Sequence, residues 1–230
     1  MTNPPPGQFI TLEGGEGLGK TTQAKLLAKA LEPHGIATLT TREPGGSHGA
    51  EAIRSILLDN QFDWSPRAES MLFSAARADH LEKTILPALA KGKWVICDRF
   101  LDSTRAYQGV VHNGRSGITD DDLLSLHRIG AKNIMPDLTL LLDLPEDDIP
   151  QIERRLMLRD GAASDRIGSR PANFHQTVRA LFRQVSRSEN YRFERISALG
   201  SIDDVHARIV KTINARFNLY VETLKTPQGA

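Results

Sequence analysis

Residues 9–27 decide the fold, and they read FITLEGGEGLGKTTQAKLL. A short β-rich run, FITLEG, passes into the segment GGEGLGKTT, which holds four glycines, one lysine and two threonines. From Thr21 to Leu31 the apolar residues then recur at intervals of three and four, which predicts an amphipathic helix. The stretch therefore predicts a strand, a glycine-rich turn and a helix in direct succession.

The glycine-rich turn fits the phosphate-binding pattern GxxxxGK[ST] over residues 14–21, which we call the phosphate loop. Backbone amides exposed in such a turn, together with the helix N-terminus, cradle phosphate oxygens. Lys20 would reach the β and γ phosphates, and the Thr21 hydroxyl would bind Mg²⁺. The motif predicts that a nucleoside triphosphate is bound by Gly14, Gly15, Glu16, Gly17, Leu18, Gly19, Lys20, Thr21 and Thr22.

The composition is that of an ordinary globular protein. Of 230 residues, 40% are hydrophobic and 25% charged, which suits one α/β domain. The 29 basic and 28 acidic residues nearly balance, so no overall charge favours nucleic acid or an anionic membrane as a partner. The single cysteine, Cys97, excludes an intrachain disulfide and fits a reducing compartment. Since no signal-like start and no apolar run of about 18 residues is present, we expect a cytoplasmic protein.

Strand-like and helix-like segments alternate along the rest of the chain. The predicted strands at 94–98 and 138–143 are almost wholly apolar, as strands buried on both faces are. This alternation predicts an α/β protein with the P-loop NTPase fold, in which helices flank a parallel sheet of about five strands. The other expected segments are a strand at 37–41 and helices at 49–58, 67–89, 120–129, 146–158, 172–191 and 202–217.

The expected organisation is one domain over residues 8–217. The segments 1–7 and 223–230 are expected to be flexible tails. A stretch rich in Gly, Ser and Arg at about 155–172 is expected to form a mobile lid.

Two predicted strands end in aspartate, at Asp98 and Asp143. Asp98 is followed by Arg99, which brings an acid and a base to the carboxyl edge of the sheet, where such folds bind their ligands. We expect Asp98 to complete the Mg²⁺ site with Thr21. Asp143 is followed by LPEDD, so its main interpretation is an N-terminal helix cap.

The motifs also narrow the class of reaction. No NKxD motif for reading guanine is present, which disfavours a GTPase, and a motor or helicase would need a larger chain. A small-molecule kinase fits better, because it needs arginines outside the phosphate loop and a movable cover that excludes water. A catalytically silent nucleotide-binding regulator is the alternative from another class, but intact Lys20, Thr21, Asp98 and Arg99 argue against it.

Four further motifs, in order, resemble those of the bacterial thymidylate kinases. They are TREPGGS (41–47), MLFSAARADH (71–80), DRFLDSTRAYQG (98–109) and DRI (165–167). The resemblance implies a kinase that transfers the γ-phosphoryl group of Mg·ATP to dTMP, giving dTDP and ADP for DNA precursor synthesis. It also implies a homodimer, formed through helices such as 67–89. Another nucleoside monophosphate kinase is the near alternative.

The resemblance implies roles for five residues at the nucleoside of dTMP. Phe73 would stack on thymine, and Arg77, one helical turn further on, would hydrogen-bond the base edge. Thr104 and Gln108, spaced i,i+4, would complete base recognition. Tyr107 would pack against the sugar.

Charged residues would handle the phosphates. Arg99 would grip the acceptor phosphate with its planar fork, Arg42 would help to position it, and Glu13 would lie near the acceptor sugar and the metal. A cis bond before Pro44 is compatible with the sequence.

Arginines of the lid would stabilise the charge that develops during transfer, because the phosphate loop offers no cation besides Lys20. This corresponds to the family subtype whose lid bears arginine. The residues in question are Arg159 and Arg166, with Arg155 as an alternative to Arg159. The expected catalytic set is Lys20, Arg99, Arg159 and Arg166.

Overall fold

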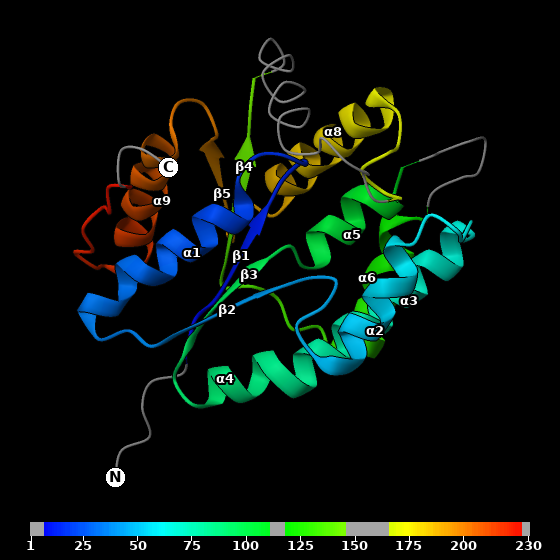
Figure 1. The fold of residues 1–230 in the computed structure, drawn as a ribbon, viewed down its shortest axis with the longest axis horizontal. Coiled ribbons are helices and arrows are strands. Elements are labelled where there is room, and N and C mark those ends of the chain that lie inside the picture. Colours follow the sequence, from blue (N-terminus) through cyan, green and yellow to red (C-terminus); the bar gives the residue numbers. More distant parts are fainter. Residues whose placement is uncertain (1–6, 111–117, 146–165, 227–230) are drawn as a thin grey trace.

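The computed structural model describes residues 7–110, 118–145 and 166–226. Five parallel strands form one sheet in the order β2-β3-β1-β4-β5 (Figure 1). Ile10 of the central strand lies opposite Ile96 on one side and Leu138 on the other. The glycine-rich turn therefore leaves the sheet from the carboxyl end of its middle strand. The strands are β1 (Phe9–Glu13), β2 (Thr38–Arg42), β3 (Trp94–Asp98), β4 (Leu138–Asp143) and β5 (Phe193–Ser197).

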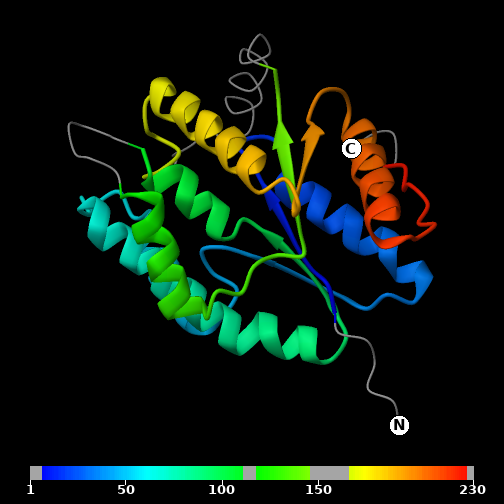
Figure 2. The ribbon, with the colours of Figure 1, turned by 180° about the vertical axis from the view of Figure 1, so that it is seen from behind.

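Helices cover both faces of the sheet (Figure 1 and Figure 2). Two of them, α1 and α9, lie on one face, and the others lie on the opposite face. The described helices are α1 (Lys20–Leu31), α2 (His48–Leu58), α3 (Pro66–His80), α4 (Leu86–Ala90), α5 (Leu101–Gln108), α6 (Asp120–Ala131), α8 (Ala172–Ser188) and α9 (Ile202–Phe217).

The apolar residues of the central strands are buried on both faces, as their composition predicts. Ile10, Leu12 and Leu140 are 0% exposed and belong to the cluster beneath α1 and α9. Phe9 and Val95 belong to a separate cluster on the other face. Full burial of a side chain of this size stabilises the fold by about 1.5–3 kcal/mol.

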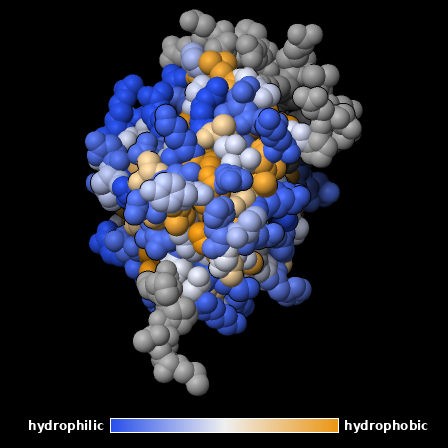
Figure 3. Space-filling view, turned by 90° about the vertical axis from the view of Figure 1, so that its left-hand side faces the viewer, coloured by the Kyte–Doolittle hydropathy of each residue, from blue (hydrophilic) through white to orange (hydrophobic). Residues whose placement is uncertain are grey.

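The face that carries α1 and α9 is largely hydrophilic, with small apolar areas between charged side chains (Figure 3). The last described residues lie along this helix pair: Asn214 bonds to both backbone polar groups of Val221, and Thr226 bonds to Asp203 at 2.7 Å. The tail expected from residue 223 thus includes residues held against α9. Within the described ranges, none of the helices is long and apolar enough to cross a membrane.

The fold class is confirmed, with two local differences in the elements. The expected helix 67–89 is divided by a π-helical turn, Leu81–Ile85, between α3 and α4. Pro87 explains the division, since it lacks the N–H that a regular helix needs there and its ring clashes with the preceding turn. β5 was not expected, because Glu194, Arg195 and Ser197 hide its pattern at the sheet edge. The expected helix 146–158 lies outside the described residues.

Candidate active site

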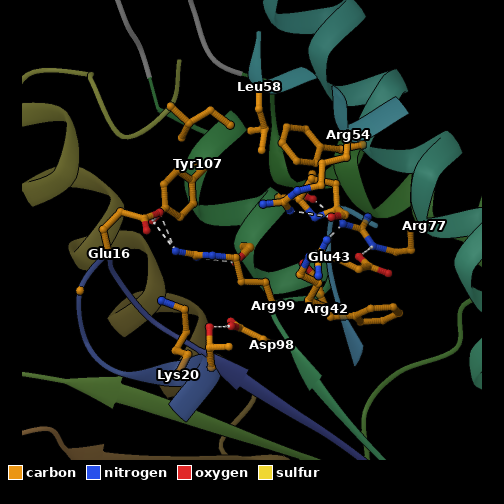
Figure 4. A pocket seen from close by; sticks show the side chains of 18 of the residues that line it. Glu16, Lys20, Arg42, Glu43, Arg54, Leu58, Arg77, Asp98, Arg99 and Tyr107 are labelled. Atoms are coloured by element: carbon orange, nitrogen blue, oxygen red, sulfur yellow. Dashed lines mark hydrogen bonds and ion pairs between the residues drawn. The ribbon is translucent and has the colours of Figure 1, made fainter. Parts of the chain in front are cut away.

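A cavity of about 420 Å³ opens beside the carboxyl edges of β1 and β3 (Figure 4). Its wall is built from the phosphate loop, the loop after β2, helices α2, α3 and α5, and the turn after β3. The carboxyl edge is where parallel sheets of this kind bind ligands, because loops and helix N-termini converge there.

The phosphate loop has the backbone that its glycines predict. Gly14 has φ 130°, and a Cβ added there would lie 2.3 Å from the carbonyl oxygen of Leu142, so only glycine fits. Gly19, at φ 83°, precedes the first helical residue, Lys20. Nζ of Lys20 is folded back onto the carbonyl oxygen of Gly15 at 2.6 Å. Burial, and then the charge of Arg99, lower the pKa of Lys20 to about 8.

Thr21 and Asp98 meet at the edge of the cavity, as the sequence predicts. The Thr21 hydroxyl donates a hydrogen bond to the Asp98 carboxylate, and both residues line the cavity. Mg²⁺ prefers oxygen ligands and is commonly held by one or two such groups together with substrate phosphates and waters. The pair therefore fits a Mg²⁺ ion that arrives with a nucleotide. Within the described residues no group of three or more His, Cys, Asp and Glu side chains could hold a metal without a nucleotide.

Arg99 is the centre of the polar contacts in the cavity. Its Nη1 donates to Ser103 Oγ at 2.9 Å and to the carbonyl oxygen of Gly14 at 3.1 Å. Its Nη2 donates to Glu16 at 2.7 Å and to the hydroxyl of Tyr107 at 3.2 Å. The backbone has φ 70°, which is unfavourable for a residue other than glycine and common at functional sites. The guanidinium is thus fixed at the junction of phosphate loop and α5.

Glu13 contacts the residues that follow Arg99 and is not among the residues that line the cavity. It is 0% exposed and accepts hydrogen bonds from the backbone N–H of Phe100 at 2.7 Å and the Ser103 hydroxyl at 2.6 Å. Burial, and then the nearby charge of Asp102, raise the pKa of Glu13 to about 8. The structure therefore differs from the expected position near the acceptor sugar, because Glu13 supports the turn that carries Arg99.

Phe73, Arg77 and Thr104 also line the cavity, and Arg77 lies across it from Glu16 and Lys20 (Figure 4). Nε of Arg77 donates to Glu43 at 2.9 Å, and its Nη2 donates to the Thr104 hydroxyl. Glu43 also bonds to His80 at 3.0 Å, so the ion pair is enclosed on both sides. The bond between Glu43 and Pro44 is cis, as the sequence allows. Arg77 is therefore held with its donors at the cavity wall.

Two more arginines line the cavity, and sequence reasoning found only one of them. Nη2 of Arg42 donates to both carboxylate oxygens of Glu51, at 3.0 and 3.1 Å. Arg54, which was not anticipated, donates to the carbonyl oxygen of Pro44 at 2.7 Å (Figure 4). In the sequence, Arg54 is one arginine on an amphipathic helix and cannot be told from a solvated one. Glu43 was quoted within the REPGG motif but received no role.

Gln108 and Arg166 are not brought to this cavity. Both instead bind Glu69, Gln108 at 2.7 Å and Arg166 at 2.6 Å, and line a second cavity of about 310 Å³. Arg159 and Arg155 lie outside the described residues.

Asp143 is paired with Arg183 and Arg195, each at 2.8 Å. It also accepts the backbone N–H of Leu144 at 2.9 Å. Two arginines thus neutralise this carboxylate, and the helix that Asp143 was expected to cap lies outside the described residues.

The glycine-rich loop lies in one cavity with the oxygen pair of Thr21 and Asp98 and with the guanidinium of Arg99. Groups suited to a nucleotide and to a second anion are what a phosphotransferase of the nucleoside monophosphate kinase class requires. The family model described as thymidylate kinase matches residues 12–209. The chain belongs to the thymidylate kinase family, whose reaction is phosphoryl transfer from ATP to dTMP.

Individual relatives agree with this assignment. The chain is 49% identical over 209 residues to a thymidylate kinase of Rhizorhabdus wittichii, covering 90% of this chain and 97% of the relative. It is 45% identical over 211 residues to a thymidylate kinase of Gluconobacter oxydans, covering 90% and 94%. The crystal structure of thymidylate kinase from Ehrlichia chaffeensis superposes with a TM-score of 0.71 at 31% identity, covering 91% of this chain and 100% of that one.

Proposed function

We propose that dTMP occupies the 420 Å³ cavity with its phosphate against Arg99 and its base beside Phe73 and Arg77, while Mg·ATP binds the phosphate loop. One observation carries this assignment: Lys20 and Arg99 line the same cavity as the apolar and donor groups of α3. This arrangement would bring the two phosphate groups side by side, with the nucleoside of dTMP pointing away from the loop.

The proposed reaction is a direct transfer. An oxygen of the acceptor phosphate attacks the γ phosphorus, the bond from that phosphorus to the bridging oxygen breaks, and ADP leaves. No general base is needed, because the acceptor is already an anion at neutral pH. Lys20 would neutralise charge on the transferring group, and Arg99 would orient the attacking phosphate.

Thr21 and Asp98 would hold Mg²⁺ on the nucleotide. The ion supplies charge neutralisation and orientation of the β and γ phosphates. The support is the oxygen pair that these side chains form.

Recognition of thymine would rest on Arg77 and Thr104. A guanidinium only donates hydrogen bonds, so Arg77 favours a keto oxygen on the base edge over an amino group. Phe73 would supply the stacking surface and Tyr107 the contact with the sugar. Gln108, expected to take part, would have to leave Glu69 to do so.

Arg42 and Arg54 are proposed to assist at the acceptor phosphate, since both line the cavity. For the lid, Arg159 stays a prediction as the charge-stabilising residue. Arg166 would need to leave Glu69 to act in transfer. A single kinase domain over 8–217 with a lid at about 155–172 remains the expected organisation.

We also propose a homodimer that works in the cytoplasm, where ATP and dTMP are found. Support for the dimer comes from Met71 on α3 and Ile129 on α6, which are 56% and 83% exposed on helices that pack together. Large apolar side chains exposed on neighbouring elements are typical of an interface.

An ADP-release assay with Mg·ATP tests the assignment, with dTMP, dUMP, dCMP, dGMP and dAMP offered separately. We expect a strong preference for dTMP and little turnover with dCMP, whose amino group faces a donor at Arg77. Efficient turnover of another monophosphate would overturn the base-site assignment, and silence with all five would overturn the reaction.

A further inference from the structure

A buried carboxylate outside the cavity joins three parts of its wall. Glu69, on α3, is 3% exposed. Its Oε1 accepts a hydrogen bond from Gln108 of α5 at 2.7 Å, and its Oε2 lies 2.6 Å from Arg166 and 2.9 Å from Arg170. Burial alone would raise the pKa of Glu69, but Arg170, Gln108 and Arg166 outweigh it and leave the pKa below the usual value.

The two arginines belong to one short turn, residues 166–170, which we call the 166–170 turn. Arg166 also donates to the carbonyl oxygen of Leu57 at 2.9 Å, and its backbone N–H donates to that of Leu58 at 3.4 Å. The guanidinium of Arg170 lies 4.6 Å from the centroid of the Phe174 ring at the start of α8. The turn is therefore attached to α2, α3 and α8 at once.

Ile167, which lies between these arginines in the sequence, lines the larger cavity that holds the proposed dTMP site. Ile167 is 8% exposed and borders the 420 Å³ cavity together with Leu58 and Phe73, whereas Arg166 and Arg170 border the 310 Å³ cavity. The attachment of the arginines to Glu69 thus fixes where Ile167 meets the proposed nucleoside site.

Glu69 also shares a helix with the residues proposed to bind the base. Glu69, Phe73 and Arg77 follow one another at intervals of four, so they lie along one side of α3. Gln108 follows Tyr107, which borders both cavities. A change at Glu69 therefore acts on a wall built from α3, α5 and the 166–170 turn.

We infer that Glu69 is a positioning residue for acceptor binding: it holds the 166–170 turn against α3, so that Ile167 closes the nucleoside end of the cavity. This inference rests on the proposed dTMP site. Glu69 does not touch the substrate and acts through Ile167. Arg166 and Arg170 are anchors of this turn in the conformation described.

The proposal predicts that the binding of dTMP changes more than turnover or the KM for ATP. In Glu69→Gln, two arginines lose their shared counter-charge, which weakens the attachment of the turn to α3. We expect the Kd of dTMP, measured by calorimetry without ATP, to rise by about tenfold, which corresponds to about 1.4 kcal/mol. The KM for ATP should stay unchanged and kcat should fall by less than about threefold, because the phosphate loop is not attached to Glu69.

A double-mutant cycle separates positioning from a loss of stability. Ile167→Ala should weaken dTMP binding on its own, and the combination with Glu69→Gln should be clearly less than additive, since both changes interrupt the same path. Ile167→Ala alone keeps the test open if Glu69→Gln does not fold. Glu82→Gln, at an exposed carboxylate in the neighbouring turn, is the matched control and should leave dTMP binding unchanged.

An unchanged dTMP Kd in folded Glu69→Gln or in Ile167→Ala would overturn the inference, and so would full additivity of the two changes. The inference would also be overturned if kcat fell and the KM values of both substrates rose by similar factors while the melting temperature dropped. If the unmodified protein does not bind dTMP, the proposed function fails instead, so the two failures are distinguishable.

Discussion

Glu16 accepts a hydrogen bond from Nη2 of Arg99 at 2.7 Å, and this ion pair joins the phosphate loop to the turn after β3 (Figure 4). Tyr107 bonds to both partners, to Arg99 at 3.2 Å and to Glu16 at 3.1 Å. An acceptor phosphate is an anion like Glu16, so it can engage a guanidinium that is already oriented. Part of the ordering of Arg99 is therefore complete before the substrate binds.

The first prediction concerns this pre-ordering. Arg99→Lys keeps the charge but loses the planar fork that reaches Gly14, Ser103, Glu16 and Tyr107 together. We expect kcat/KM for dTMP to fall by about a hundredfold or more, with a near-normal melting temperature. The exposed Arg128→Lys is the control for the same chemical change. A loss of less than about threefold would contradict the role given to Arg99.

The second prediction combines activity and stability at Lys20. Lys20→Met should abolish measurable turnover, because the ammonium that neutralises the γ phosphate is removed. The empty protein should nevertheless become more stable at pH 7, by about 1–3 kcal/mol, since a buried charge is replaced by an apolar chain. The pKa lowered from 10.5 to about 8 means that the cost of the charge is complete below pH 8.

That stability gain has a defined pH dependence. Between about pH 8 and pH 10.5 the unfolded chain binds the proton better than the folded protein does, so the unmodified protein gains stability there and the advantage of Lys20→Met shrinks. Urea unfolding at pH 7 and pH 9.5 measures the difference in unfolding free energy between Lys20→Met and the unmodified protein. Lys25→Met, exposed on the same helix, should show no such trend. An advantage that grows with pH would reverse the sign and exclude the explanation.

Some of these residues could be predicted from sequence for a physical reason. The strand, turn and helix at 9–31 are determined by residues close together in the sequence. A β-rich run, glycines with positive φ and apolar residues at helical spacing follow one another directly. The positions of Lys20, Thr21 and Asp98 can then be predicted, because the carboxyl ends of parallel strands lie at the same edge of the sheet. The fold and the side of the cavity formed by the phosphate loop could therefore be predicted from sequence.

Other features depend on contacts that are distant in sequence. β5 is recognisable only because it pairs with β4, as its own residues are mostly polar. Gln108 has the spacing of a base-reading residue, yet its side chain donates to Glu69, 39 residues earlier, and borders the second cavity. Arg54 acquires its position from the loop that contains Pro44. In each case the partner, and not the residue type, determines the outcome.

The third prediction follows from the burial of Glu13. Its pKa is raised from 4.5 to about 8, so the folded protein binds this proton better than the unfolded chain does between those values. Stability associated with Glu13 is complete below pH 4.5 and is lost as the pH rises to about 8. Glu13→Gln, which can keep the bonds to Phe100 and Ser103, should remove this loss.

The measurement is the difference in unfolding free energy between Glu13→Gln and the unmodified protein at pH 5, 6.5 and 8. The variant should gain relative stability across this range and level off above it. Glu194→Gln, exposed on β5, serves as the control. A flat difference would show that Glu13 is ionised throughout.

The fourth prediction concerns magnesium. Asp98→Asn removes the carboxylate charge at the Thr21 contact and should raise the Mg²⁺ concentration for half-maximal activity by about tenfold. Initial rates at saturating ATP and dTMP, over a series of free Mg²⁺ concentrations, give this value, and excess EDTA should abolish activity. Asp121→Asn, exposed on α6, should leave the Mg²⁺ curve unchanged. A shift equal in both variants would remove Asp98 from the metal site.

The last prediction tests the proposed dimer through its exposed apolar side chains. Met71 and Ile129 lie on helices joined by the hydrogen bond from the Ser74 hydroxyl to Leu126, so a second copy could cover both at once. Light scattering should give the unmodified protein twice the chain mass of 25.4 kDa. Met71→Glu and Ile129→Glu should each shift it toward one chain mass, because a buried unpaired carboxylate opposes association. Tyr220→Glu, 88% exposed beyond α9, should stay dimeric, and a dimer that resists both glutamates would use another face.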